Sequence, residues 1–317
     1  MRKLLYILLP GLTVFTACEK KLQVDDMSFG VTPDSTAYHA GSNVKFTFDG
    51  NPTTITFYSG EQGRQYQYRN RVTAPGTAVL QFSTALNTIG ATGSLQLMVS
   101  TDFKGVVVGD TAKTQANISS AKWDDITSRA KFATNATATA SGVVDLSDYS
   151  NGTPVYLAFK YAAAANLIQN KWTISGLTVT NTLKDGSAYT IANLNANNTA
   201  ITTNYGGANT FSPGWVAYPI SNTYNWVVTA GTSLVITGAA TAAAATSPAE
   251  AWTVMGPLDL QKVTPDIGVA IKSITLAVPS YTYVYSKAGT YTATFVAANA
   301  TPDAENSAVS TVDLTIQ

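Results

Sequence analysis

The chain of 317 residues has little of the equipment that most enzymes and nucleic-acid-binding proteins use. It contains one histidine, His39, and one cysteine, Cys18, whereas histidine-activated nucleophiles and zinc sites need such residues in defined sets. Charged residues make up only 12% of the chain, and 19 basic side chains balance 19 acidic ones. Because nucleic-acid binding depends on a basic surface, we expect no nucleic-acid partner.

These shortages predict a protein without catalytic residues. No glycine-rich phosphate loop precedes a helical segment, and His39 lies in a stretch rich in Gly, Ser and Asn, where we expect an ordinary residue beside a turn. A glycosidase that uses two carboxylates is the enzyme class left open, because any two acidic side chains could meet in the fold. The sequence predicts no enzyme and no cofactor.

The sequence also lacks a hydrophobic run long enough to span a membrane, which takes about 20 residues. The apolar residues 4–14 follow Arg2 and Lys3 and have the length of a signal-peptide core. They lead into Val14-Phe15-Thr16-Ala17-Cys18, which resembles the lipobox of bacterial lipoproteins. The resemblance implies a signal peptide over residues 1–18, a lipid on Cys18 and a polar tether over 19–27. An ordinary signal peptide ending near a chance cysteine is the alternative.

The residues after Cys18 bear on where the protein is displayed. In lipoproteins of the Bacteroidota type, acidic residues directly after the cysteine favour export to the cell surface. Here Glu19, Asp25 and Asp26 are interrupted by two lysines. We expect an outer-membrane lipoprotein that is exposed at the cell surface and reaches the membrane through its lipid anchor.

The rest of the chain predicts an all-β fold. Short runs rich in Thr, Val, Ile, Tyr and Phe alternate with polar residues and are separated by Gly, Asn, Asp, Ser and Pro. Convincing helical periodicity is absent, and the alanine-rich residues 162–167 and 239–245 are too short to form helices by themselves. We expect these two segments to be loops.

The two ends of the chain are each small for a domain. Residues 28–75 predict strands at 28–31, 44–48, 53–58 and 64–71; residues 273–317 predict strands at 281–285, 290–297 and 309–316. Segments of this size are near the ~40 residues below which a core seldom suffices without disulfides or metals. We therefore predict one discontinuous sandwich made of 28–75 and 273–317, with two independent small domains as the alternative.

The residues of these segments support the merger. Tyr291, Ala293, Phe295 and Ala297 share one strand face, and Phe57 falls near a central position. The stretch Lys287-Ala288-Gly289-Thr290-Tyr291-Thr292-Ala293-Thr294-Phe295-Val296 resembles the closing half of a PKD-type immunoglobulin-like repeat. The resemblance implies an immunoglobulin/PKD-like β-sandwich.

The intervening residues 76–272 are enough for one jelly-roll β-sandwich. Residues 123–127 and 172–174, and the turn at 142–149 that leads into Val155-Tyr156-Leu157-Ala158-Phe159, resemble the cleaved-adhesin and galactose-binding-like jelly rolls. As a whole the chain resembles an uncharacterised family of Bacteroidota surface lipoproteins associated with polysaccharide utilisation. The resemblance implies a polysaccharide or oligosaccharide ligand and, as partners, the proteins of an outer-membrane uptake complex.

Jelly rolls of this group bind glycans with exposed aromatic rings and with polar loop groups. Trp172, Trp252 and Trp123 fit the core better, and Trp226 fits either role. Trp215 lies in a predicted loop rich in Gly and aromatic residues. We predict a glycan site that consists of Tyr205, Phe211, Trp215 and Tyr218, with Asn204 and Asn209 as polar partners. The alternative is that these rings plug the end of the sandwich.

A structural calcium ion is a smaller hypothesis. Its candidate ligands are Asp102, Asp110, Asp124, Asp125, Asp145 and Asp148. No EF-hand spacing selects among them, and turn and capping roles explain most aspartates in β proteins. We expect no metal site.

These observations predict a lipid-anchored, non-catalytic carbohydrate-binding protein of the cell surface that captures glycan for a neighbouring uptake system. The alternative from another class is a structural or adhesive surface protein, in which both sandwiches serve as spacers or protein-binding modules.

Overall fold

The computed structural model describes residues 24, 27–90, 92–105, 107, 110–194, 202–204, 215–222, 224, 226–229, 233–274, 277–302 and 304–317. It describes the backbone alone for residues 111, 202–204, 215–219 and 228–229. The expected signal peptide and the lipobox cysteine Cys18 lie outside the described residues. Within the described part of the chain, no helix has the length and hydropathy needed to cross a membrane.

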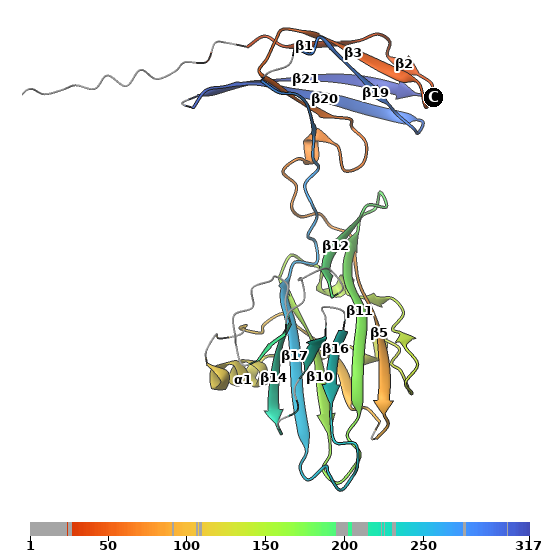
Figure 1. Cartoon of the computed structure of the whole chain (residues 1–317), viewed down its shortest axis with the longest axis vertical. Helices are drawn as coiled ribbons and strands as arrows, with labels where there is room; N and C mark the ends of the chain where they lie inside the picture. The colour runs from red at the N-terminus through yellow and green to blue at the C-terminus, as the bar shows by residue number, and fades with distance from the viewer. Residues whose placement is uncertain are drawn as a thin grey trace, which may run out of the picture. The chain divides into compact units, whose positions relative to one another are not determined.

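The described chain divides into two compact units (Figure 1). Unit 1 comprises the described residues up to Arg69 together with Asp266–Gln317, and unit 2 comprises Asn70–Pro265. The sequence placed these two boundaries near residues 75 and 273. Each unit is built from two β-sheets that enclose an apolar core. The predicted all-β sandwich fold class is therefore confirmed.

Unit 1 contains a three-stranded sheet in the order β1-β3-β19 and a five-stranded sheet in the order β18-β4-β20-β21-β2. Strand β2 is parallel to β21, and the other pairs are antiparallel. The strands are β1 (Gly30–Pro33), β2 (Ala37–Tyr38), β3 (Asn43–Asp49), β4 (Thr54–Tyr58), β18 (Val269–Lys272), β19 (Ser280–Val284), β20 (Gly289–Ala300) and β21 (Glu305–Ile316).

The two segments of unit 1 are interleaved in both sheets. Strand β4 lies between β18 and β20, with Phe57 opposite Val269 on one side and Phe295 on the other. In the second sheet, Phe46 of β3 pairs with Tyr281 of β19. Because each segment supplies the neighbours of the other, neither can complete a sheet by itself.

Aromatic residues from both segments fill the core of unit 1. Phe57 is 1% exposed, and its ring centroid lies 5.9 Å from that of Phe46 and 4.9 Å from that of Phe295. Tyr285 is buried beside them and its hydroxyl donates to the carbonyl of Ser59 over 2.8 Å. As predicted, Ala293, Phe295 and Ala297 are buried on one face of β20, with Tyr291 packed against the same core.

The strand expected at residues 64–71 was wrong. This segment forms a turn followed by the 3-10 helix η1 (Tyr66–Tyr68). The turn is set by Gly60, whose φ of +82° suits glycine and whose absent Cβ would lie 2.7 Å from the carbonyl oxygen of Thr292. The Gln65 N–H then donates to Asp266 rather than to a neighbouring strand.

Unit 2 contains a six-stranded sheet in the order β13-β14-β17-β10-β6-β7 and a second sheet in the order β15-β16-β11-β5-β8, with β12 paired to β11 and β9 paired to β5. Its strands are β5 (Thr77–Thr88), β6 (Leu95–Ser100), β7 (Asp124–Asp125), β8 (Thr139–Ala140), β9 (Val144–Asp145), β10 (Val155–Ala163), β11 (Lys171–Thr182), β12 (Ala188–Asn193), β13 (Thr202–Asn204), β14 (Trp215–Ser221), β15 (Val227–Thr229), β16 (Ser233–Thr237) and β17 (Ala249–Leu258). The 3-10 helices are η2 (Thr127–Arg129) and η3 (Ser147–Tyr149).

The core of unit 2 lies between these two sheets. Alternate residues of β10, including Leu157 and Phe159, are buried against Leu80 and Phe82 of β5 and Ile174 of β11. The two expected loops at residues 162–167 and 239–245 contain no helix, although the first begins within the end of β10.

Two short segments of unit 2 repeat one local structure. Residues 125–127 and 145–147 each place an aspartate before a buried Ile or Leu and a Thr or Ser. In each, the aspartate accepts from the backbone N–H two residues later, over 2.9 and 2.8 Å. Arg129 joins the two by donating to both carboxylate oxygens of Asp148.

The helix α1 (Thr111–Ser120) was not expected from the sequence. Its N-cap is Asp110, whose carboxylate accepts from the N–H of Lys113 over 2.8 Å. Ile118 packs with Trp252, Val254 and Phe103 against the outer face of the six-stranded sheet. Because its cap and tertiary packing stabilise this helix, it forms although its sequence shows little helical periodicity.

The interleaving predicts that residues 28–72 cannot fold alone. The fragment should give a disordered circular-dichroism spectrum and a poorly dispersed amide NMR spectrum, because its strands lack their partners. Adding residues 266–317 in trans should restore dispersion, whereas residues 70–265 should fold without help. Cooperative melting of 28–72 by itself would contradict the discontinuous domain.

Tyr285→Phe should destabilise the protein by about 1–3 kcal/mol, because the carbonyl of Ser59 loses its buried donor. Burial raises the pKa of Tyr285 above its ordinary value near 10. Tyr285 therefore contributes stability that is fully present below pH 10 and is lost as the pH rises toward the folded pKa.

Chemical denaturation from pH 7 to 11 tests this expectation. The variant should lose less stability than the wild type above pH 10. Tyr291→Phe is the matched control, since the Tyr291 hydroxyl makes an exposed bond to Lys287. Equal alkaline losses in Tyr285→Phe and the wild type would show that Tyr285 is not the titrating group.

Candidate functional site

The residues predicted to bind glycan fall mostly outside the described part of the chain. Tyr205, Asn209 and Phe211 lie outside the described residues. Asn204 ends β13, beside Ala217 of β14. The structure brings these two strands together.

The expected loop does not extend to Trp215 and Tyr218. Trp215 begins β14, where it pairs with Met255, and Tyr218 pairs with Trp252. The residues before β14 are rich in Gly and Pro, but the backbone hydrogen bonds that β17 offers favour a strand from Trp215 onward. The placement of these two residues in a loop was therefore wrong.

The other tryptophans are core or near-core residues. Trp172 and Trp252 are each 5% exposed, and Trp226 is fully buried with its indole N–H donating to the carbonyl of Ala251. Trp123 is half-buried, with its ring centroid 5.0 Å from that of Trp252. The core role favoured for Trp172 and Trp252 is confirmed, and Trp226 takes the core role as well.

The candidate calcium ligands are used in local hydrogen bonds. Asp110 caps α1, Asp125 and Asp145 cap turns, and the Arg129 guanidinium holds the pKa of Asp148 below its usual value. The remaining two also accept hydrogen bonds, Asp102 from the Ser100 hydroxyl and Asp124 from the Tyr149 hydroxyl. Among the residues that the structure describes, no three His, Cys, Asp or Glu side chains gather as a metal site would require.

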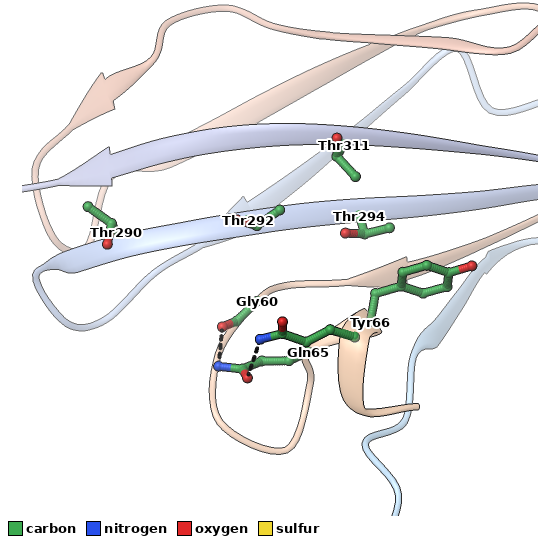
Figure 2. Close-up of a pocket in the computed structure, with 8 residues that line it drawn as sticks. Gly60, Gln65, Tyr66, Thr290, Thr292, Thr294 and Thr311 are labelled. Atoms are coloured by element: carbon green, nitrogen blue, oxygen red, sulfur yellow. Dashed lines mark hydrogen bonds between the residues drawn. The ribbon is translucent and has the colours of Figure 1, made fainter. Parts of the chain in front are cut away.

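The described residues do form a polar pocket in unit 1 (Figure 2). Its volume is about 350 Å³, which falls in the range of small-ligand sites. One wall is the outer face of β20 and β21, and the other is the turn and 3-10 helix that follow β4. The lining residues are Gly60, Gln65, Tyr66, Gln67, Thr290, Thr292, Thr294 and Thr311.

The threonine wall follows directly from strand alternation. Tyr291, Ala293 and Phe295 point to the core, so Thr290, Thr292 and Thr294 line the opposite face at two-residue intervals. Thr294 pairs with Thr311 across the two strands. Thr290 and Thr311 are exposed, so their hydroxyls are available to a ligand, whereas Thr294 is only 2% exposed.

The facing wall is an amide pair held in place by the turn. The Gln65 amide donates to the carbonyl of Gly60 over 3.3 Å, and the Gln67 amide donates to Gln65 over 3.4 Å (Figure 2). Gly60 in turn packs its Cα against the backbone of Thr292. The two walls therefore meet at the contact between Gly60 and β20.

Tyr66 supplies the aromatic surface of the pocket. Its ring packs edge-on with Tyr58 at a centroid distance of 5.3 Å, and the Arg69 guanidinium carbon lies 3.9 Å from its centroid. These two neighbours fix the ring orientation. Arg69 covers part of the ring, so the tyrosine offers a partial apolar wall.

The lining consists of hydroxyls, amides, backbone and one phenol ring. Two nearby carboxylates are engaged by the protein, because Asp266 accepts from the Gln65 N–H and Asp313 accepts from the Thr292 hydroxyl over 2.8 Å. Such a surface can bind a neutral ligand with many hydroxyl groups through hydrogen bonds, with Tyr66 against its apolar face.

Sequence reasoning missed this pocket. The pattern Thr290-x-Thr292-x-Thr294 was visible, and it marks the strand side that faces away from the core and is rich in hydroxyls. The opposite wall was missed because residues 64–71 were expected to be a strand.

Comparison with known proteins identifies one family for this chain. A family model described as "Domain of unknown function (DUF5017)" matches residues 17–199, which is more than half of the 317 residues. The match crosses the boundary at Arg69 and ends within unit 2. No curated protein and no solved structure matched the chain. The chain belongs to the DUF5017 family.

Proposed function

We propose that this protein is a lipid-anchored, non-catalytic carbohydrate-binding protein of the outer cell surface, which captures glycan for a neighbouring uptake system. The observation that carries the binding proposal is the polar pocket of unit 1. Its hydroxyls and amides match the hydrogen-bonding groups of a neutral sugar, and Tyr66 matches the apolar side of a sugar ring. The lipid anchor rests on the motif that ends at Cys18.

The strength of such a site favours polymers over single sugars. Four hydrogen bonds at about 1 kcal/mol each give a dissociation constant on the order of 1 mM. The outward threonines on β20 repeat at two-residue intervals, about 7 Å apart. A polysaccharide that offers many equivalent units gains avidity from many anchored copies on one surface.

An adhesive role is the second candidate, and one edge of unit 1 favours it. Strand β2 pairs with β21 only at Thr315 and Ile316. Along Ser307–Asp313, the same edge has no strand partner among the described residues. Such an edge can accept a strand from another protein.

Replacing Cys18 tests the anchor. In cells fed an alkyne fatty acid, the wild type should carry the label and enter the detergent phase, whereas Cys18→Ser should do neither. The label reports acylation of the cysteine, and entry into the detergent phase is expected because several acyl chains on one cysteine anchor a protein firmly. Digestion of the wild type by protease added to intact cells would support surface display. Equal labelling of Cys18→Ser would rule out this lipid site.

Isosteric variants of the pocket test carbohydrate binding. Thr290→Val and Thr311→Val remove an exposed hydroxyl at nearly constant shape, and each should weaken retention in a polysaccharide affinity gel by about threefold to tenfold. Gln67→Ala removes one amide and should act in the same direction. The measurement uses residues 19–317 against a panel of neutral polysaccharides.

Thr282→Val is the matched control, because Thr282 is exposed on β19 in the other sheet of unit 1. Trp215→Ala in the same gels tests the site first predicted from the sequence. Retention lost only in Trp215→Ala would move the binding site to unit 2. Wild-type protein retained by no polysaccharide would favour the adhesive role.

A further inference from the structure

A second cavity, of different chemistry, lies within unit 2. It has a volume of about 290 Å³ and is found where the connection between β5 and β6 meets the start of β11. Its walls include Leu86, Leu95 and Ala133, which are 7%, 4% and 3% exposed. Trp172 and Phe132 complete the apolar lining, and none of the lining residues is charged.

The polar groups at the floor of this cavity are bonded to one another. The Trp172 indole N–H donates to the Ser94 hydroxyl over 2.9 Å, and the Asn170 amide donates to the same oxygen over 2.6 Å. The side-chain oxygen Oδ1 of Asn170 accepts from the backbone N–H of Gly90. A ligand on this floor therefore meets apolar surfaces, because the buried polar atoms already have partners.

The wall formed by the β5–β6 connection is held close to the segment before β11. A Cβ on Gly90 would overlap the carbonyl oxygen of Ile168, so only glycine permits this approach. The hydrogen bond from Gly90 to Asn170 fixes the same contact. The cavity is thus shaped by backbone packing.

The mouth of the cavity exposes a large apolar side chain. Ile89 is one of the lining residues and is 59% exposed. Leu167 and Ile168, in the segment that contacts Gly90, are 49% and 36% exposed. Several exposed aliphatic side chains beside an apolar cavity are typical of a binding site rather than of ordinary surface.

The two aromatic rings of the wall favour an aromatic guest. Phe132 and Trp172 are nearly perpendicular, at an interplanar angle of 84° and a centroid distance of 6.3 Å. Perpendicular rings offer the edge of one and the face of the other. A third ring can then stack on one and meet the other edge to face, which are the two favourable aromatic geometries.

We propose that this cavity binds a small uncharged aromatic group of one or two rings. Apolar cavities of ~150 Å³ bind benzene, so 290 Å³ accommodates one substituted ring or a fused pair. A charged ligand would lose its hydration and find no counter-ion in the lining. The hydroxyls of Thr92 and Thr134 at the rim suit a neutral polar substituent.

Benzamide and benzoate are a matched pair of probes that differ in charge. In two-dimensional NMR titrations of residues 19–317, benzamide should bind saturably, with a dissociation constant on the order of 1 mM. It should shift the Trp172 indole signal and the Gly90 and Ala133 amides. Benzoate should bind at least about tenfold more weakly. The Trp172 signal is assigned with Trp172→Phe.

Two variants keep the proposal testable. Ala133→Leu places three further carbons in the cavity and should weaken benzamide binding by about tenfold or more. Ile89→Ala should weaken it by about threefold and fold normally, because Ile89 is mostly exposed. Val143→Ala is the control, since Val143 is 64% exposed and is not part of the lining.

Three outcomes would overturn the proposal. The first is an unchanged benzamide affinity in both Ala133→Leu and Ile89→Ala. The second is shifts that spread over residues away from the cavity, or equal binding of benzoate. The third is self-association of the protein that Ile89→Ala abolishes and that competes with benzamide, which would make a second copy the occupant. None of these outcomes bears on glycan retention by unit 1, so the two proposals fail separately.

Discussion

The structure of unit 1 depends on the burial of strand faces that come from opposite ends of the chain. Phe57 on β4 packs against Phe295 on β20 and Phe46 on β3. Because β4 is hydrogen-bonded on both sides to strands of the C-terminal segment, this aromatic core exists only when the segments meet. A chain without disulfides in its described part relies on such packing, and residues 70–265 form a second unit inserted in sequence between the two segments.

The same constraint creates the polar pocket. Its threonine wall is the reverse side of the core strand β20, and its amide wall follows β4 directly in sequence. The contact of Gly60 with the backbone of Thr292 joins residues that are more than 200 positions apart. The pocket is therefore a product of the discontinuous fold. Substitutions in the core of unit 1 would also disturb the shape of the pocket. The apolar cavity of unit 2 is likewise shaped by a contact between distant residues, because Gly90 and Asn170 are 80 positions apart.

Strand patterning accounts for what could be predicted. The alternation around Tyr291, Ala293 and Phe295 identified the buried face, and the small size of each end segment indicated their merger. The failures have tertiary causes. Helix α1 is stabilised by Asp110 and by packing of Ile118, residues 64–71 turn because of Gly60 and Asp266, and Trp215 joins a strand because β17 is beside it. Asp266 and β17 are far in sequence from the segments they affect, so a local pattern could not reveal them.

By itself, the sequence determined the all-β class, the inward faces of the long strands, the scarcity of His, Cys and charged side chains, and the motif at Cys18. These follow from local periodicity and composition, which a chain carries whatever its partners are. Only the tertiary structure decided which polar and apolar residues share a cavity. Hydroxyls on one strand and amides on a distant turn come together through long-range pairing, and the position of a cavity depends on backbone contacts such as Gly60 with Thr292 and Gly90 with Ile168.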